Sequence, residues 1–175
     1  MKKKLVFYAA WNFLRLNLLK IISCGKFKSG QVQLISSATE LELDKNSKII
    51  LKGRVHAEKN VLISAKDGGK LTCGNLYINR NSMIVCRESI SIGDGTTIGP
   101  NVVIYDHDHD IQECGKLKKA KVVIGKNVWI GAGAIILKGV TIGDNAVVAA
   151  GTVVSKDIPE NTLVRSQLSN IYKEL

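Results

Sequence analysis

Aliphatic residues recur at every sixth position through the C-terminal third of the chain. The series is unbroken from residue 124 to residue 154, and a companion series of small or β-branched residues runs two positions ahead of it. The aliphatic series is Ile124, Ile130, Ile136, Ile142, Val148 and Val154, and the companion series is Val122, Val128, Ala134, Val140, Ala146 and Thr152. A helix repeats every 3.6 residues and a strand every two, whereas a parallel β-helix uses six residues for each strand and turn. The spacing therefore predicts an all-β chain folded as a parallel β-helix.

A second stretch upstream repeats the same spacing. Its aliphatic members are Ile92, Ile98 and Ile104, and their companions are Ile78, Ile84, Ile90, Thr96 and Val102. Three units make one triangular coil whose aliphatic side chains point into the prism, with Gly, Asn-Gly or Asp-Gly expected at the corners. An α/β domain with repeated short strands is the competing interpretation, and the in-register spacing of both stretches argues against it. Before residue 76 the period is poorer, and we expect irregular early coils there.

The ladder loses its register between Ile104 and Ile124. These residues are 20 apart, which is not a multiple of six, so part of the segment at about 105–121 must leave the prism as an extruded loop. The loop begins with "DHDHD", residues 106–110, which holds two of the three histidines of the chain. Loops on a rigid scaffold are where catalytic residues concentrate. We therefore expect the functional site at this loop.

The N-terminal segment is basic and apolar. Seven Lys and Arg residues and no acid lie in the first 30 residues, while the rest of the chain is nearly balanced in charge. The body lacks a basic stripe with interleaved aromatics, which argues against nucleic-acid binding. On a helical wheel one apolar arc forms, made of Phe7, Ala10, Trp11, Leu14, Leu18, Ile21 and Ile22. Three interpretations stay open: a helix through residues 1–23 on an anionic membrane surface, a helix packed on the protein or its oligomer, and a spanning or signal segment.

The spacing of the cysteines indicates in which cellular compartment the protein lies. None of the four, Cys24, Cys73, Cys86 and Cys114, is part of a CxxC pair, which argues against a zinc knot or a redox motif. Free thiols are typical of a reducing compartment, so we expect a cytoplasmic protein that is either free or peripheral on the inner face of the membrane.

The length of 175 residues fits one domain with terminal additions. We expect a basic amphipathic N-terminal helix in residues 1–30 and a β-helix catalytic domain in residues 31–160. Residues 161–175 are expected to form a C-terminal cap with a short helix, because neither end of a solenoid can bury its own face.

The repeats and the loop together resemble the hexapeptide-repeat acyltransferases of the galactoside and maltose O-acetyltransferase type, above all the branch that acetylates polysaccharides and capsules. The resemblance covers about residues 70–162, in "YINRNSMIV", "IGDGTTIGPNVVIYDHDHDI" and "VVIGKNVWIGAGAIILKGVTIGDNAVVAAGTVVSKDIP". It implies a left-handed β-helix, a homotrimer with active sites between neighbouring prisms, acetyl-CoA as the donor, and no metal.

The resemblance also implies roles for individual residues. Laid without a gap on the family pattern, "NVVIYDHDH" puts the catalytic histidine at His109, and "YINRN" puts an active-site asparagine near the acceptor at Asn79. The tryptophan that borders the cofactor channel matches Trp129. The residues that line the CoA arm match Ala132, Ala150, Ser155 and Lys156.

Two positions depart from the family pattern. An aspartate that helps to hold sugar in the galactoside enzymes aligns with Arg87, so we expect Arg87 on the acceptor side and do not carry galactoside specificity over. The closing "G-x-P-A-K" is replaced by "VRSQLSN", which changes the contacts to the distal end of CoA.

Transfer of an acetyl group to a hydroxyl needs a general base and a hydrogen-bond donor that stabilises the oxyanion. Histidine is the commonest general base in enzymes, so His109 is the candidate base, Asp106 or Asp108 would orient it, and Asn79 or backbone N–H groups would stabilise the oxyanion. From alternation along the chain we expect His107 to point away from His109 and to bind the acceptor. The predicted function is transfer of an acetyl group from acetyl-CoA to a hydroxyl of a sugar or of a cell-surface polysaccharide precursor, in a ternary complex.

Other functions stay open at this point. The acceptor could be a small molecule: serine, an antibiotic, or the amine of a nucleotide sugar. A three-histidine metal site for hydration is disfavoured by the close spacing of the two loop histidines. A non-catalytic β-helix scaffold is the remaining alternative. Cys114 has no neighbour that would activate it as a nucleophile, and His56 is most simply a surface or coil residue.

Overall fold

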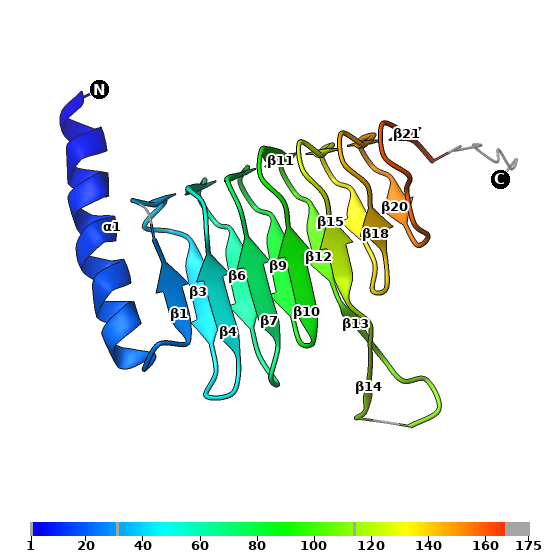
Figure 1. The fold of residues 1–175 in the computed structure, drawn as a ribbon, viewed down its shortest axis with the longest axis horizontal. Coiled ribbons are helices and arrows are strands. Elements are labelled where there is room, and N and C mark those ends of the chain that lie inside the picture. Colours follow the sequence, from blue (N-terminus) through cyan, green and yellow to red (C-terminus); the bar gives the residue numbers. More distant parts are fainter. Residues whose placement is uncertain (1, 31, 114, 167–175) are drawn as a thin grey trace, which may run out of the picture.

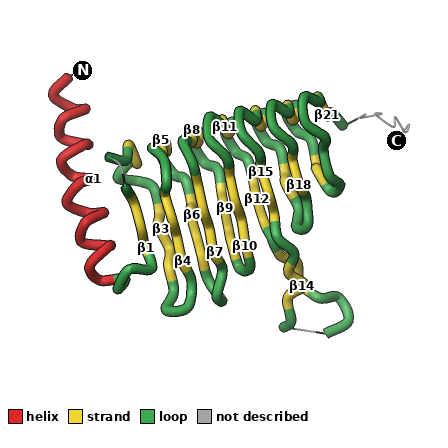
Figure 2. Tube along the Cα trace, viewed as in Figure 1, coloured by secondary structure: helices red, strands yellow, loops and turns green. Residues whose placement is uncertain are grey.

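A computed structural model describes residues 2–30, 32–113 and 115–166. The chain winds as a parallel β-helix with one helix at its N-terminal end (Figure 1). Strands occupy the three flat sides of the prism, and loops turn its corners (Figure 2). The predicted all-β solenoid is confirmed.

Each side of the prism is one parallel sheet. Sheet A holds β1 (Phe27–Ser29), β4 (Lys48–Leu51), β7 (Lys70–Cys73), β10 (Ser89–Ile92), β15 (Val122–Ile124) and β18 (Thr141–Ile142). Sheet B holds β2 (Leu34–Ile35), β5 (Val55–Ala57), β8 (Leu76–Ile78), β11 (Thr96–Ile98), β16 (Trp129–Ile130), β19 (Val147–Val148) and β21 (Leu163–Val164). Sheet C holds β3 (Glu40–Leu43), β6 (Leu62–Ala65), β9 (Met83–Cys86), β12 (Val103–Tyr105), β17 (Ile135–Ile136) and β20 (Val153–Val154).

The core is the column of side chains that the six-residue ladder places inside the prism. Every member of the aliphatic and companion series from residue 122 to residue 154 is buried. Some companions are small, as at Ala134 and Ala146, and no member of either series in this range is aromatic. The inward direction predicted for both series is therefore confirmed.

The early coils are longer than the late ones. Lys48 pairs with Lys70, 22 residues on, whereas Val123 pairs with Thr141, 18 residues on. The extra residues lie in the strands, since β4 and β6 hold four residues each whereas β17 and β18 hold two, and this hides the six-residue period before residue 76.

Asparagine occupies many of the corner turns of the prism. Asn60, Asn81, Asn101, Asn127, Asn145 and Asn161 all have positive φ, between 54° and 59°. Asparagine tolerates this left-handed conformation better than other residues with a side chain. Its amide also bonds to the next coil: Asn145 Nδ2 donates to Asn161 Oδ1 at 3.0 Å.

The predicted extruded loop is a β-hairpin. β13 (His107–His109) pairs antiparallel with β14 (Leu117–Lys119) and projects from the corner between sheets C and A (Figure 1). At its neck the Ala120 N–H donates to the Asp106 carbonyl at 2.9 Å. The hairpin gives the histidine segment a regular strand geometry that the sequence did not predict.

Helix α1 (Lys2–Ile22) caps the N-terminal end of the prism. Leu16 is buried against the first coil, and Arg15 donates to the Thr39 carbonyl at 2.7 Å. β1 begins at Phe27, so the prism starts inside the segment predicted as N-terminal helix. Within the described ranges no helix is both long and apolar enough to span a membrane.

The C-terminal cap is only partly described. β21 adds a last strand to sheet B within the predicted cap. The short helix expected in residues 161–175 falls largely on residues 167–175, which lie outside the described ranges.

Candidate functional site

A groove lies where the hairpin leaves the prism. Its volume is about 410 Å³, and we call it the hairpin groove. Strands β3, β6, β9 and β12 of sheet C supply its floor, and β13 supplies its rim. It is lined by Glu42, Ser64, Lys66, Val85, Arg87, Tyr105, His107, Asp108 and His109. The predicted residues Arg87, His107, Asp108 and His109 are thus brought together in one concavity.

Asp106 is the aspartate that points inward. Its side chain is fully buried at the prism corner, where Oδ1 accepts from the Arg87 N–H and Oδ2 from the Glu88 N–H, both at 2.8 Å. The Cys86 thiol adjoins the same carboxylate, and burial followed by this negative charge raises the pKa of Cys86. Asp106 therefore fixes the turn of the preceding coil at the base of the hairpin.

His107 is held by Asp106. Its Nδ1 lies 3.1 Å from Asp106 Oδ1, and its ring meets Tyr105 edge-on with centroids 5.5 Å apart. Only 12% of its side chain is exposed. When Nδ1 carries the proton and donates to the carboxylate, Nε2 is left as an acceptor. The buried carboxylate thus positions His107, and among the described residues it makes no hydrogen bond to His109.

His109 is exposed on the same rim. The expectation that His107 and His109 point in opposite directions is wrong, since residues two apart on a strand share a face and both border the hairpin groove. Asp108, between them, forms an ion pair with Lys138 from the turn after β17. The hairpin therefore presents two imidazoles to one space.

The floor of the groove carries paired charges. Lys66 Nζ lies 2.9 Å from Glu42 Oε2, and the Ser64 hydroxyl donates to the same oxygen at 2.8 Å. These hydrogen bonds, that of Lys66 first, lower the pKa of Glu42. Arg87 forms an ion pair with Asp67 while its buried Nε has no hydrogen-bond partner among the described residues. Arg87 therefore keeps a buried N–H beneath the groove with no acceptor in the described part of the chain.

Several groove residues were missed in the sequence. Glu42, Ser64 and Lys66 belong to the long early coils, where the six-residue count cannot assign a face. Their signal is the pairing at a 22-residue offset, as between Glu42 and Ser64, which becomes visible only with the register known.

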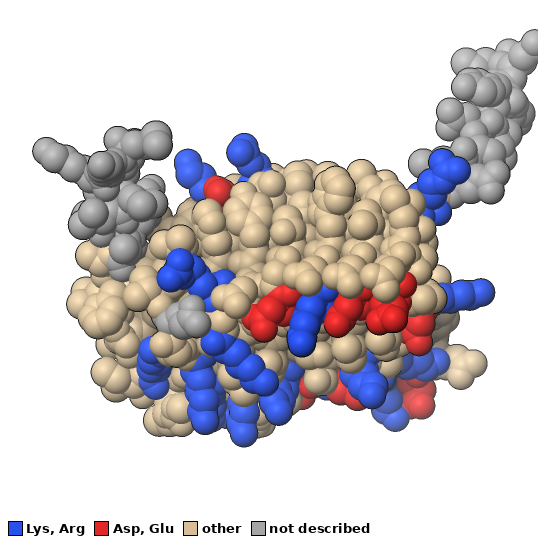
Figure 3. All heavy atoms as spheres, turned by 45° about the horizontal axis from the view of Figure 1, so that its top comes forward, with Lys and Arg blue, Asp and Glu red and all other residues tan. Residues whose placement is uncertain are grey.

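A second concavity, the sheet B cleft, lies on the outer face of sheet B. Its volume is about 560 Å³, and its walls are mostly apolar. It is lined by Tyr77, Asn79, Thr97, Ile98, Gly99, Pro100, Trp129, Gly131, Ala132, Val147, Val148, Ala149, Ala150 and Leu163. The predicted residues Asn79, Trp129, Ala132 and Ala150 meet here. Figure 3, which brings the top of Figure 1 forward, shows an area without charged side chains over these coils.

The two concavities lie at opposite edges of sheet C. Asn79 follows β8 at the corner between sheets B and C, whereas His109 follows β12 at the corner between sheets C and A. Ser155 and Lys156 are exposed at this latter corner, after β20, apart from the other predicted cofactor residues. A single chain therefore does not unite the predicted base with the predicted cofactor cleft.

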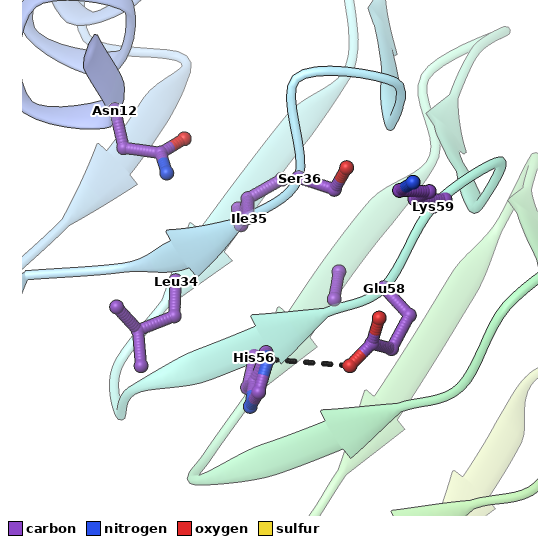
Figure 4. Close-up of a pocket in the computed structure, with 8 residues that line it drawn as sticks. Asn12, Leu34, Ile35, Ser36, His56, Glu58 and Lys59 are labelled. Carbon is purple, nitrogen blue, oxygen red and sulfur yellow. Dashed lines mark ion pairs between the residues drawn. The ribbon is translucent and has the colours of Figure 1, made fainter. Parts of the chain in front are cut away.

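The remaining candidates lie elsewhere. His56 is half-buried on β5, near α1, with its Nε2 3.6 Å from Glu58 Oε1 (Figure 4). Cys114 lies outside the described residues, and the buried Cys73 has its pKa raised to about 12 by desolvation. Over the part of the chain that the structure describes, no three His, Cys, Asp or Glu side chains cluster as metal ligands would.

Comparison with known proteins finds matches throughout the prism. Residues 121–156 match the family model described as bacterial transferase hexapeptide (six repeats), and residues 80–106 match the hexapeptide repeat of succinyl-transferase. The chain is 35% identical over 168 residues to a putative acetyltransferase of Saccharomyces cerevisiae, covering 91% of this chain and 84% of that protein.

Two further similarities concern proteins named for their activity or ligand. The galactoside O-acetyltransferase of Escherichia coli is 38% identical over 58% of this chain and 52% of its own length. The chain thus spans about half the length of the first curated relatives that it matches. A hexapeptide-repeat acetyltransferase of Vibrio cholerae, solved with acetyl coenzyme A, has 25% identity and a TM-score of 0.58 over 92% of this chain and 81% of its own.

Proposed function

Because the chain belongs to the hexapeptide-repeat acetyltransferase family, we propose that it moves an acetyl group from acetyl-CoA to a hydroxyl of a sugar or of a cell-surface polysaccharide precursor. The observation that carries the proposal is the pair of imidazoles, His107 and His109, that the hairpin holds over one groove. A groove with paired carboxylates and cations suits a polyhydroxyl ligand, because sugar hydroxyls both donate and accept hydrogen bonds.

The sheet B cleft is the proposed site of the cofactor arm. Its apolar, uncharged walls match the chemistry of a thioester-bearing pantetheine chain, and Trp129, 58% exposed, offers a flat ring at its edge. Ser155 and Lys156 would contact the same cofactor from the other corner of a neighbouring prism.

A shared active site follows from the separation of the two concavities. In a cyclic trimer each interface joins two different patches of neighbouring copies, so the hairpin groove of one prism can adjoin the sheet B cleft of the next. An outward-facing apolar column on sheet C supports such contact; its members are Leu62, Met83, Val103, Ile135 and Val153. We therefore propose a homotrimer with three sites between subunits.

The proposed mechanism needs no acyl-enzyme. His109 accepts the proton of the acceptor hydroxyl as its oxygen attacks the thioester carbonyl, and Asn79 or a backbone N–H donates to the oxyanion. The tetrahedral intermediate then collapses, the carbon–sulfur bond breaks, and the imidazolium returns the proton to the departing thiolate of CoA. Asp106 would act through His107, which binds the acceptor, and Arg87 would contact the acceptor from the floor of the groove.

The test of the base is CoA release with candidate saccharide acceptors. His109→Ala should lower kcat by about 10²–10⁴-fold. His107→Ala should mainly raise KM, and His56→Ala, on another sheet, serves as the matched control with unchanged turnover. Full turnover by His109→Ala would show that His109 is not the base. A loss of kcat by the same factor in His107→Ala, and not in His109→Ala, would assign that role to His107.

The acceptor class needs its own comparison. A small-molecule acceptor, either serine, an antibiotic or a nucleotide-sugar amine, is the second candidate, and turnover with these in the same assay would favour it. Absence of CoA release with every acceptor, together with no binding of CoA, would favour a non-catalytic scaffold. The cytoplasm, expected from the free thiols, stays the proposed location.

The shared site is tested by mixing two inactive variants. If His109 and Asn79 of one site come from different subunits, trimers reassembled from His109→Ala and Asn79→Ala chains should regain about a quarter of wild-type activity, since one interface in four pairs two intact residues. If both residues of a site belonged to one chain, the mixture would stay inactive.

A further inference from the structure

Helix α1 contacts the prism through its less apolar side. Asn12 and Leu16 are buried, Leu19 packs on the core, and Arg15 donates to backbone carbonyls of the first coil. The described members of the apolar arc face away from the prism: Trp11 is 47% exposed, Leu14 69%, Leu18 59%, Ile21 76% and Ile22 67%. These five apolar side chains are therefore without cover in the single chain.

An exposed apolar arc of this kind indicates a binding partner. Contiguous exposed apolar surface of this kind is rare on soluble monomers and marks an interaction site. Leu14, Leu18 and Ile21 fall within about 60° on the helical wheel, so a flat apolar surface could contact all three at once.

The charges near the arc identify the occupant. Seven Lys and Arg residues precede Glu40, the first acid of the chain. Lys28 is exposed on β1, and Lys20 lies in the last turn of α1. A second copy of this segment would bring like charges together, which opposes association. An anionic surface with an apolar interior complements both features.

We propose that α1 lies in the plane of an anionic lipid bilayer with the arc from Trp11 to Ile22 inserted among the acyl chains. This inference is independent of the chemistry of the active site. It also gives the prism an orientation: α1 runs across the end of the prism, so the prism axis stands up from the membrane (Figure 1).

The orientation fixes how far the site stands from the lipid. The floor of the hairpin groove spans four successive coils from β3 to β12. At about 4.8 Å for each coil the groove extends about 20 Å from the capped end. A saccharide carried on a membrane lipid would reach this distance with a few sugar units.

The test uses full-length protein and vesicles. Binding is measured by flotation with vesicles of phosphatidylcholine alone and with about a quarter phosphatidylglycerol. Trp11 fluorescence, in a Trp129→Phe background, should shift to the blue with the anionic vesicles. The pair Leu14→Gln and Leu18→Gln should weaken this binding by roughly 30-fold or more, since each removes an inserted isobutyl group. Lys20→Gln with Lys28→Gln should weaken it by about 30-fold, on anionic vesicles only.

The matched control is Ile111→Gln, which removes an apolar side chain that is 99% exposed on the hairpin, away from α1. It should bind vesicles as the wild type does. Far-UV circular dichroism and the melting temperature should be unchanged in the leucine pair, because both side chains are exposed. Equal vesicle binding by the leucine pair and the wild type would overturn the proposal. Loss of oligomeric mass in the leucine pair, without effect on vesicles, would also overturn it and assign the arc to a second copy.

Discussion

Replacing Asp106 by asparagine should destabilise the corner from which the hairpin projects. The carboxylate is fully buried and accepts from two backbone N–H groups at 2.8 Å. Asparagine keeps one of the two acceptor oxygens and places an amide N–H₂ against the other donor. One hydrogen bond to a charged group is lost and a buried donor is left unpaired, so we expect a loss of about 2–3 kcal/mol in unfolding free energy.

Asp108→Asn is the matched control, two residues along the same segment. Its carboxylate is half-exposed and pairs with Lys138 on the surface, so the loss should stay below about 1 kcal/mol. Equilibrium unfolding in urea, at one protein concentration, should separate the midpoints of the two variants by about 1 M. Equal midpoints would refute the inference that Asp106 holds this corner.

Three further predictions concern other parts of the prism and the helix that caps it. Iodoacetamide near neutral pH should label the exposed Cys24 and spare Cys73 and Cys86, since burial raises the pKa of both; peptide mass mapping checks this. Asp44→Asn should lower the free energy of unfolding by about 1 kcal/mol at neutral pH. Hydrogen bonds from a side-chain hydroxyl and backbone N–H groups lower the Asp44 pKa to about 2, so this stabilisation is complete above its unfolded pKa near 4, and the difference in urea midpoint should close as pH falls towards 2. Gly131→Ala should lower the melting temperature, because its Cβ would lie 2.5 Å from a backbone nitrogen of the next coil.

The late coils could be predicted from the sequence because each aliphatic residue of the six-residue series meets the same requirement, which is to fill the interior of the prism. Ile130 and Ile136 fill the same position in successive units, and every unit must bury one such side chain. The early coils lack this signal since their strands are longer and unequal in length, so a residue such as Ser64 could not be assigned to a face. A fixed period predicts the fold only while every strand-and-turn unit has the same length.

The site was predictable in its position more than in its geometry. The loss of register placed the extruded loop correctly, but the exposed hairpin has no apolar alternation to predict its strands. The inward direction of Asp106 depends on backbone donors of the previous coil, about 18 residues earlier, which no local pattern encodes. His107 and His109 were expected on opposite sides, whereas strand geometry puts them on one side.

The hydrogen bond at the neck of the hairpin makes the register of the prism independent of the length of the hairpin. Because Ala120 bonds directly to Asp106, the prism resumes at the corner where it was left, whatever lies between them. Residues 110–116, between the two strands of the hairpin, can therefore be lengthened, shortened or exchanged without shifting the register of a single coil and without removing His107 or His109. The tip of the hairpin can thus change in length and sequence while the core stays the same.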